Sequence, residues 1–410
     1  MNLLSVTEAR ERILSHFQPV TTESLPMTEC LNRVLAEDIF APYDLPQFDN
    51  SSMDGFAIRS ADTSDATAAS PRILRVVADI PAGKAPTIAL APGEAARIMT
   101  GAQIPQGADA VVPVEDTDYN NRDSGSPAPG EVKVFKTIDG HANTRPRGTD
   151  VHSGDVILNK RRVLKAQDIS MLASLSKARV EVFRKPRVAL FSTGDELLDQ
   201  NESLQPGKIR ESNSYMLLGL MSSDPVQVIR LGIAKDSFAS VKAFFDKAES
   251  LKVDLILSSA GVSVGAYDFV KNVIDQNGRL DFWRVNMRPG KPLAFGEYGK
   301  IPYIGLPGNP VSAFAGFEVF VRQALEKLCG LQVRSRQTVR VRCEEDVNSD
   351  GRESYLRARI REENGVTFAR LTGHQGSGNI LSLVQADALL IIPAGVKCVP
   401  AGQEVDAWIL

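Results

Sequence analysis

Apolar and polar positions follow different periods in successive sections of the chain. Near the N-terminus, Ser5 to Glu8 fits a capping box, and apolar residues at helical spacing predict a helix that reaches Phe17. A further apolar run predicts a second helix over residues 28–39. Between residues 72 and 136, short alternating or apolar runs separated by Gly, Pro and Asp predict the strands of a small β-domain.

From residue 187, strand patterns and helix patterns alternate. Apolar strands at 187–192, 225–233 and 253–259 are each followed by a helical run. Three short strands come next, and then a long helix over residues 309–328. Such alternation predicts a parallel sheet with helices on both faces.

The last section loses the helical period. Runs such as QTVRVRC and VTFARL predict strands, and Asn364-Gly365 is a strong two-residue hairpin signal. These features predict a small β-barrel or sandwich.

We therefore predict a multidomain α/β-plus-β protein. Its parts are a central three-layer α/β domain, an inserted N-terminal β-domain and a C-terminal β-barrel. The expected boundaries are 1–45 with 138–178 for a discontinuous N-terminal domain, 46–137 for the inserted domain, 179–330 for the α/β domain and 331–410 for the barrel.

Composition narrows the classes of partner. The net charge of −3 gives no general basic field, so we expect neither nucleic acid nor a membrane surface as a partner. The four cysteines are far apart in the chain, which argues against a zinc cluster and for a reducing compartment. With no apolar run long enough to span a bilayer, we expect a cytoplasmic protein.

Five loops at the carboxyl ends of the predicted strands carry the candidate chemistry, because open parallel sheets bind ligands at that edge. They are Ser192–Glu196, Lys235-Asp236, residues 258–268, Arg288–Pro292 and Leu306–Ser312.

Small residues in such loops let backbone N–H groups approach an oxyanion, and Arg288 and Lys291 add positive charge. Glu196, Asp236 and Asp268 are oxygen ligands of the kind that Mg²⁺ prefers. Each residue taken singly also has a structural explanation, since either aspartate can cap a helix and the cations can be solvated edge charges. Together the loops predict a site for a phosphorylated ligand and a divalent cation.

Other nucleotide and hydrolase motifs do not fit. The chain has no Walker A sequence, no GxGxxG after its first α/β strand, no metal-binding histidine spacing and no nucleophile elbow.

Residues 46–59, PQFDNSSMDGFAIR, match neither helix nor strand periodicity, and they introduce a resemblance. The chain resembles the MoeA family of molybdopterin molybdenumtransferases, which includes the E domain of gephyrin. Eight motifs correspond in family order: FDNSSMDGFA, IMTGAQIPQGADAVVPVED, NTRPRGTDVHSGD, ALFSTGDEL, SSAGVSVGAYDF, MRPGKPLAFG, GLPGNPVSA and GHQGSGN.

The resemblance implies an activity in molybdenum cofactor biosynthesis. The substrates would be adenylylated molybdopterin and molybdate, the phosphoanhydride would be cleaved with release of AMP, and Mg²⁺ would assist. It also implies a homodimer with each active site at the subunit interface, and a transient contact with the molybdopterin adenylyltransferase.

The resemblance further assigns roles by position. Asp54, Thr100, Asp268 and Glu196 would be catalytic, with Asp54 and Thr100 acting across the interface, and Glu196, Asp236 and Asp268 would hold Mg²⁺. The remaining binding residues would be Ser258, Ser259, Gly261, Ser263 and Gly265 around the terminal phosphate, Asp236 near the phosphates, and Arg288, Lys291, Ser312, Arg357 and Ser377 around molybdate.

Two residues depart from the family pattern. Ala260 stands where many members have glycine, and Arg288 replaces a common lysine, which keeps the charge but changes its geometry.

Two alternative functions stay open: a non-catalytic molybdopterin-binding scaffold, and a tungstate-selective paralogue.

Overall fold

The computed structural model describes residues 3–120, 125–261 and 269–410. The chain forms two compact units. The first contains Met1–Glu37, Lys160–Ala173 and Lys177–Leu410, and the second contains Asp38–Asn159 with Ser174–Ser176. Across the described ranges, none of the helices is both long enough and apolar enough to span a bilayer.

The centre of the first unit is a six-stranded sheet in the order β16-β13-β17-β21-β20-β18. Its strands are β13 (Arg187–Thr193), β16 (Gln227–Ala234), β17 (Leu255–Ser259), β18 (Gly278–Arg284), β20 (Pro292–Tyr298) and β21 (Ile301–Leu306). The first four strands in that order are parallel, and β20 and β18 run antiparallel to their neighbours.

The predicted parallel pairing holds for the first four strands and changes to antiparallel pairing at one edge. Tyr298 and Ile301 pair directly across Gly299 and Lys300, and a connection this short can join only antiparallel strands. No helical run separates residues 292–298 from residues 301–306 in the sequence, and this short spacing could have predicted the antiparallel pairing.

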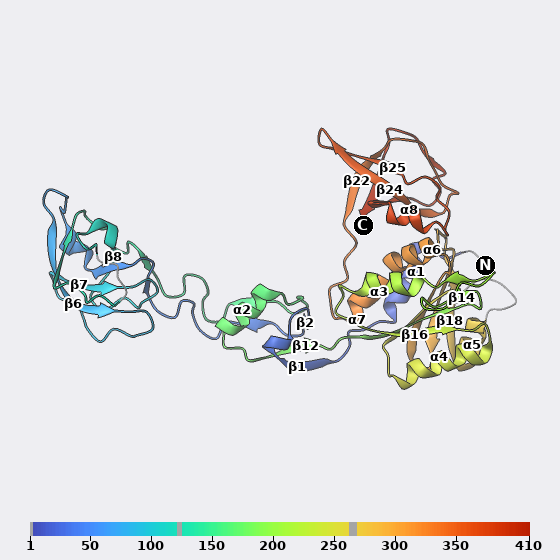
Figure 1. Ribbon diagram of the computed structural model, residues 1–410, viewed down its shortest axis with the longest axis horizontal. Coiled ribbons are helices and arrows are strands. Elements are labelled where there is room, and N and C mark those ends of the chain that lie inside the picture. Colours follow the sequence, from blue (N-terminus) through green and yellow to red (C-terminus); the bar gives the residue numbers. More distant parts are fainter. Residues whose placement is uncertain (1–2, 121–124, 262–268) are drawn as a thin grey trace. The chain divides into compact units, whose positions relative to one another are not determined.

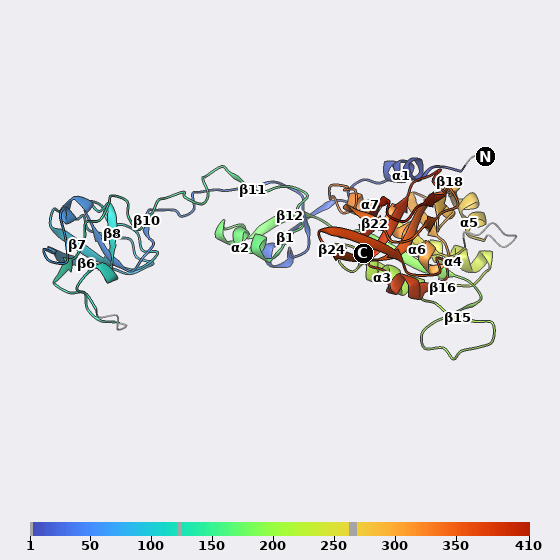
Figure 2. The same cartoon turned by 90° about the horizontal axis from the view of Figure 1, so that it is seen from above.

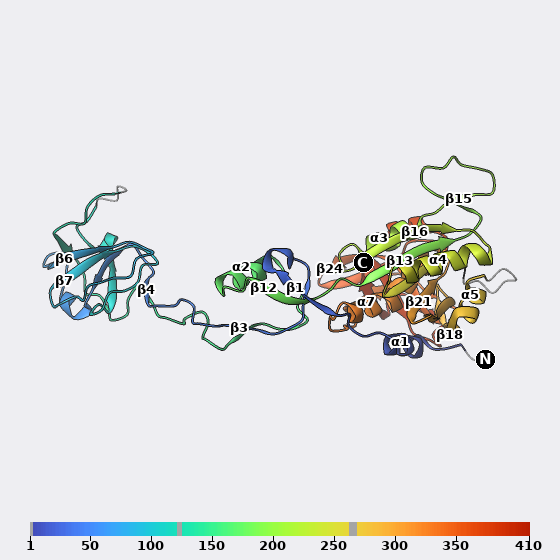
Figure 3. The same cartoon turned by 90° about the horizontal axis from the view of Figure 1, so that it is seen from below.

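Helices cover both faces of this sheet and make a three-layer domain (Figure 1). They are α1 (Val6–Ser15), α3 (Asn213–Met221) and the continuous helix of α6 (Pro310–Gly316), η4 (Phe317–Val321) and α7 (Arg322–Leu328) on one face, and α4 (Phe238–Ser250) and α5 (Phe269–Asn277) on the other. Figure 3 shows α4 and α5 from their own side of the sheet.

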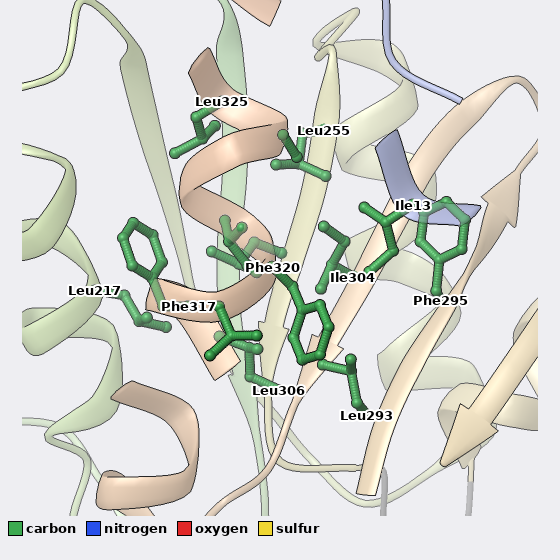
Figure 4. Packing of buried hydrophobic residues seen from close by; sticks show 14 of the residues in the cluster. Ile13, Leu217, Leu255, Leu293, Phe295, Ile304, Leu306, Phe317, Phe320 and Leu325 are labelled. Carbon is green, nitrogen blue, oxygen red and sulfur yellow. The ribbon is translucent and has the colours of Figure 1, made fainter. Parts of the chain in front are cut away.

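Successive side chains of a strand point to opposite faces of the sheet, so each strand contributes to the hydrophobic core on both faces. Val188 and Leu190 of β13 join the core under α3 and α6–α7, whereas Ala189 and Phe191 join the core under α4 and α5. In the first core, Phe317 and Phe320 of η4 pack over β17 and β21, and Ile13 brings α1 into the same cluster (Figure 4). This packing confirms the predicted helices at residues 5–17 and 309–328.

A small sheet precedes the α/β domain along the chain. It has the order β1-β12-β2, formed by β1 (Thr22–Pro26), β12 (Arg179–Phe183) and β2 (Val34–Leu35), with η1 (Met27–Glu29) and α2 (Ala166–Ser174) beside it in sequence. The predicted helix over residues 28–39 is wrong. Asn32 has a left-handed backbone (φ 59°), which ends any helix, and Val34 pairs with Phe183 instead.

The second unit contains a five-stranded sheet in the order β8-β5-β7-β6-β9. The strands are β5 (Gly55–Ile58), β6 (Arg72–Ile80), β7 (Glu94–Ile98), β8 (Ala110–Pro113) and β9 (Glu131–Val134), with η2 (Ser60–Thr63) and η3 (Val114–Asp116) between them. Short pairs join β4 (Asn50–Ser51) to β10 (Thr144–Arg145) and β3 (Ile39–Phe40) to β11 (Val156–Leu158). The expected β-domain is confirmed, and the four-domain division with the boundaries given above stays a prediction.

The C-terminal region is a closed β-barrel. Strands β24 (Glu353–Glu363), β25 (Val366–Leu371), β22 (Thr338–Cys343), β28 (Glu404–Ile409) and β26 (Ala388–Ile392) pair in turn, and β26 returns to β24. Asn364-Gly365 forms the predicted hairpin between β24 and β25. Helix α8 (Ile380–Val384) and the pair β23 (Val347–Asn348) and β27 (Cys398–Val399) complete the region.

Two further pairings involve strands of only two residues. Strand β19 (Met287–Arg288) leaves the α/β domain to pair with β24 of the barrel. Strands β14 (Leu197–Leu198) and β15 (Ile209–Arg210) pair with each other, and the exposed segment between them projects from the domain (Figure 2).

Candidate functional site

Two acidic loops meet at the carboxyl edge of the sheet. The backbone N–H of Asp195, after β13, donates to Oδ2 of Asp236, after β16, and the N–H of Asp236 donates to Oδ1 of Asp195, both at 3.3 Å. Glu196 is exposed, and its carboxyl group lies so close to Gly194 that an added Cβ there would be 2.5 Å from Oε2. The sequence reading chose Glu196 and Asp236 and missed Asp195, which contacts Asp236 directly.

The loop after β17 begins inside the sheet. Ser258 and Ser259 are buried, and the hydroxyl of Ser258 lies 2.7 Å from the Tyr303 hydroxyl in the core. Ala260 has a left-handed backbone (φ 70°), and Gly261 follows in the same region (φ 71°). Three predicted residues, Ser263, Gly265 and Asp268, lie outside the described residues.

Asn213 joins this loop to the loop after β21. Its Nδ2 donates to Oγ of Ser259 and to the carbonyl of Gly308, both at 2.7 Å. Its Oδ1 is buried and has no hydrogen-bond partner among the described residues, and the same holds for Oγ1 of Thr193 beside Gly261. Buried polar atoms are rarely left unpaired, so these two atoms indicate places for a ligand's donors.

Sequence reasoning missed Asn213, although the signal was present. It lies in the polar run Glu211–Ser214, which opens helix α3 directly after β15. Glu211 is itself buried and accepts hydrogen bonds from Oγ of Ser192 and from the backbone of Ser214. These bonds attach the start of α3 to the end of β13.

A second group of predicted residues lies around the start of α6. Gly290, between Arg288 and Lys291, lies next to α6, since an added Cβ would be in van der Waals contact with Ser312, 3.6 Å from its carbonyl oxygen and 4.0 Å from its Cβ. The barrel loop 373–379 also reaches this helix, since the N–H of Val311 donates to the carbonyl of Ser377 at 3.1 Å. Asn309 occupies the expected N-cap position but donates its Nδ2 to Oγ of Ser377 at 2.9 Å instead of capping the helix.

Arg357 is the buried cation of this group. Its side chain on β24 is fully buried, its Nε donates to Oγ of Ser382 at 3.1 Å, and one Nη2 bond reaches the carbonyl of Gly376 at 3.0 Å. Its Nη1 is buried and has no hydrogen-bond partner in the part of the chain that the structure describes. Burial, together with the positive charge of Arg288, lowers the pKa of Arg357 to about 10. A buried cation beside another cation, with an unused donor, is a place for an anion.

The structure thus brings Arg288, Ser312, Arg357 and Ser377 together through α6 and the barrel. It places Lys291 at the exposed end of the same loop. The acids Glu196 and Asp236 lie at the ends of β13 and β16, on the other side of β17 in the strand order.

The second unit holds the remaining predicted pair. Oδ1 of Asp54 accepts hydrogen bonds from the backbone N–H and from Oγ1 of Thr100, both at 2.7 Å. Both residues are exposed. The two residues, 46 positions apart in sequence, therefore form one local group.

The acidic loops supply part of a ligand set for a divalent cation. No group of three His, Cys, Asp or Glu side chains suited to a metal occurs within the ranges that the structure covers. Asp195 and Asp236 nevertheless place two carboxylates together, and Mg²⁺ is commonly held by one or two carboxylates plus water and substrate phosphates.

The close packing of Gly261 yields a stability prediction. An added Cβ would lie 2.7 Å from both Oγ1 of Thr193 and Cγ2 of Val270. We expect Gly261→Ala to lower the free energy of unfolding by about 2–3 kcal/mol. Gly365→Ala is the matched control, because its φ is similar and its surroundings are open, so it should cost only about 1 kcal/mol. Urea unfolding of both variants measures the difference, and equal losses would contradict the packing argument.

Known protein families match most of the chain. Residues 4–176 match the MoeA N-terminal region (domain I and II), residues 189–327 match the "Probable molybdopterin binding domain", and residues 340–410 match the MoeA C-terminal region (domain IV).

Curated relatives align over nearly their whole length. The chain is 38% identical to a molybdopterin molybdenumtransferase of Nostoc sp., over 94% of this chain and 88% of that protein. It is 36% identical to molybdopterin molybdenumtransferase 2 of Mycobacterium tuberculosis, over 98% and 99%. The crystal structure of a molybdopterin biosynthesis MoeA protein from Pyrococcus horikosii superposes with a TM-score of 0.83 at 31% identity, covering 100% of this chain and 99% of that one.

Proposed function

Because the chain belongs to the molybdopterin molybdenumtransferase family, we propose that it inserts molybdate into adenylylated molybdopterin and releases AMP, with Mg²⁺ as the assisting cation. Membership in this family makes the chain a transferase of molybdenum cofactor biosynthesis. The adenylylated substrate, the release of AMP and the role of Mg²⁺ belong to the proposal.

The observation that carries this proposal is the buried, unused Nη1 of Arg357 beside Arg288. A tetrahedral dianion needs two or three cations together with hydroxyl and amide donors. Arg288, Lys291 and Arg357 supply the charge, and Ser312 and Ser377 supply hydroxyl groups at the start of α6. These five residues are the proposed molybdate pocket.

The loop after β17 is the proposed site for the terminal phosphate of molybdopterin. Gly261 lets the loop pack closely against Thr193 and Val270, and Asn213 fixes the loop through Ser259. The unpaired Oδ1 of Asn213 and Oγ1 of Thr193 can accept hydrogen bonds from the pterin. Ser258 supports the strand through Tyr303, and Ser263 and Gly265 keep their predicted role in the loop.

Asp236 and its neighbour Asp195 would hold Mg²⁺ together with the predicted ligands Glu196 and Asp268. When bound there, the cation would neutralise negative charge on the nucleotide phosphates. The chain's own contribution is to hold the acidic loops together through the reciprocal Asp195–Asp236 bonds.

Asp54 and Thr100 are proposed to act from the partner subunit of a homodimer. Thr100 fixes the carboxylate of Asp54 through two donors to Oδ1, and the carboxylate held in this way is proposed to orient water or a molybdate oxygen at the phosphoanhydride. Asp268 is the second candidate for that role. The cations of the molybdate pocket would hold the oxyanion beside the pterin dithiolene while the anhydride is cleaved.

The direct test is a complete reaction with purified protein. Adenylylated molybdopterin, Mg²⁺ and molybdate are incubated with the chain, and AMP and finished cofactor are measured together. The proposal expects the two products in equal amounts. Pterin binding without AMP release would instead support the alternative of a non-catalytic scaffold, and faster turnover with tungstate would support the tungstate-selective alternative.

A further inference from the structure

A cleft with six charged side chains in its walls lies away from the proposed active site. It has a volume of about 380 Å³ and is enclosed by α1, the η4–α7 helix, the connection into β22, and strand β28. Its walls include Arg10, Arg322, Arg334 and Arg336, together with Glu318 and Glu326. None of the residues assigned above to molybdate, pterin or Mg²⁺ lines it.

The charges of this cleft are only partly balanced. Glu318 is buried and accepts hydrogen bonds from Arg322 at 2.6 and 2.8 Å, and it also pairs with Arg336. The guanidinium groups of Arg10 and Arg334 form no hydrogen bond or ion pair with any residue that the structure describes. Arg322 also pairs with Asp224 at 3.5 Å, so that four arginines face three carboxylates and one positive charge is left over, with Arg10 and Arg334 available to bind an anion.

The same cleft contains an unused acceptor. Nε2 of Gln323 donates to the carbonyl of Arg334 at 3.1 Å, which fixes the orientation of the amide. Its Oε1 is buried without a hydrogen-bond partner. A buried acceptor of this kind costs free energy unless a donor reaches it. A ligand that carries both an anionic group and a donor would satisfy Gln323 and the free arginines together.

The helix that forms one wall is irregular at this point. Residues Phe317–Val321 form a π-helical turn, and Glu318 and Val319 from this turn line the cleft. Single π-helical turns inside α-helices occur frequently at functional sites. Glu318 is eight residues beyond Pro310, or about 12 Å along the helix axis, which separates the cleft from the proposed molybdate pocket.

We propose that this cleft is a binding site for a small organic oxyanion, a phosphate ester or polycarboxylate that also carries a hydroxyl donor. Arg10 and Arg334 bind the anionic group, and Oε1 of Gln323 accepts the hydrogen bond from the hydroxyl group. Trp408, which lines the cleft with the guanidinium of Arg336 over its ring, provides apolar surface for the carbon skeleton. The site is independent of the proposed catalytic function.

The test uses calorimetric titration of the full chain with glycerol 3-phosphate and with citrate, both of which carry an oxyanion and a hydroxyl group. We expect saturable binding of at least one probe, weakened about tenfold by Arg334→Gln and by Arg10→Gln, as for loss of one charge-assisted contact. Gln323→Met should weaken the hydroxyl-bearing probes but leave the binding of pyrophosphate, which has no hydroxyl donor on carbon, unchanged.

Two matched controls separate the possible outcomes. Arg340→Gln removes an exposed arginine of β22 that pairs with Asp406 outside the cleft, and it should leave binding unchanged. Arg357→Met removes the buried cation of the proposed molybdate pocket, and it should also leave binding unchanged. Binding lost in Arg357→Met but kept in Arg334→Gln would place the probe in the molybdate pocket and overturn the proposal. Absence of saturable binding for both probes would overturn it as well.

Discussion

Replacing Arg357 with methionine should raise the molybdate concentration for half-maximal turnover by about 100-fold. Losing one partner of a buried, hydrogen-bonded charge pair costs about 2–5 kcal/mol, and about 2.7 kcal/mol corresponds to 100-fold. The effect should be this large because Arg357 is fully buried and has an unused donor. Turnover at several molybdate concentrations measures the shift.

Three comparisons make this prediction specific to the anion. Arg357→Lys keeps a charge but not the planar fork, so it should give an intermediate shift. Arg359→Gln, two residues along β24, removes an exposed arginine that donates to the carbonyl of Gln385, and it should behave like the original chain. Binding of adenylylated molybdopterin should be the same in all three variants. A loss of pterin binding equal to the loss of molybdate response would refute the assignment.

Asp54→Asn should lower the rate of AMP release by about 100-fold or more at saturating substrates, because a positioned carboxylate contributes about 10²–10⁴-fold to proton transfer. Asparagine has nearly the same shape but cannot accept a proton, so the fold of the second unit should be unchanged. Quench-flow measurement of AMP gives the rate, and circular dichroism checks the fold.

Neighbouring substitutions test whether the effect belongs to Asp54. Thr100→Val removes the Oγ1 donor but keeps the backbone N–H bond to Asp54, so it should cost only about tenfold. Asp62→Asn changes an acid of the same unit that accepts from the N–H of Gly93, and it should have no effect. Full activity in Asp54→Asn would leave Asp268 as the remaining candidate for that role.

Much of the α/β domain could be predicted from the chain, because its strands are long and apolar and its helices have a clear period. The loops at the carboxyl ends were found for the same reason, since β13, β16, β17 and β21 are parallel. The antiparallel edge and the β2 region were mispredicted because pairing partners rather than periodicity decided the structure there: β20 and β21 are joined by a two-residue turn, and β2 has only two residues.

The sequence predicts which loops form the site, but not which side chains contact one another there. Periodicity locates the loop after β13, yet the choice between Asp195 and Glu196 depends on the backbone turn at Gly194. Asn213 lies in a helix first turn, where capping explains its residue type, and its bonds to Ser259 and Gly308 exist only after the strands assemble. Arg357 reads as an ordinary alternating strand residue, and it was assigned through the family resemblance rather than from its spacing.

The most direct test of a site shared between two chains is complementation. Asp54→Asn and Arg357→Met chains are mixed in equal amounts under conditions that let dimers exchange subunits, at a molybdate concentration low enough that each variant alone should be nearly inactive. If Asp54 of one subunit serves the Arg357 pocket of the other, about a quarter of all sites regain both original residues, and about a quarter of the original AMP release returns. No recovery above the two separate variants, with exchange verified by mass spectrometry, would contradict the shared site.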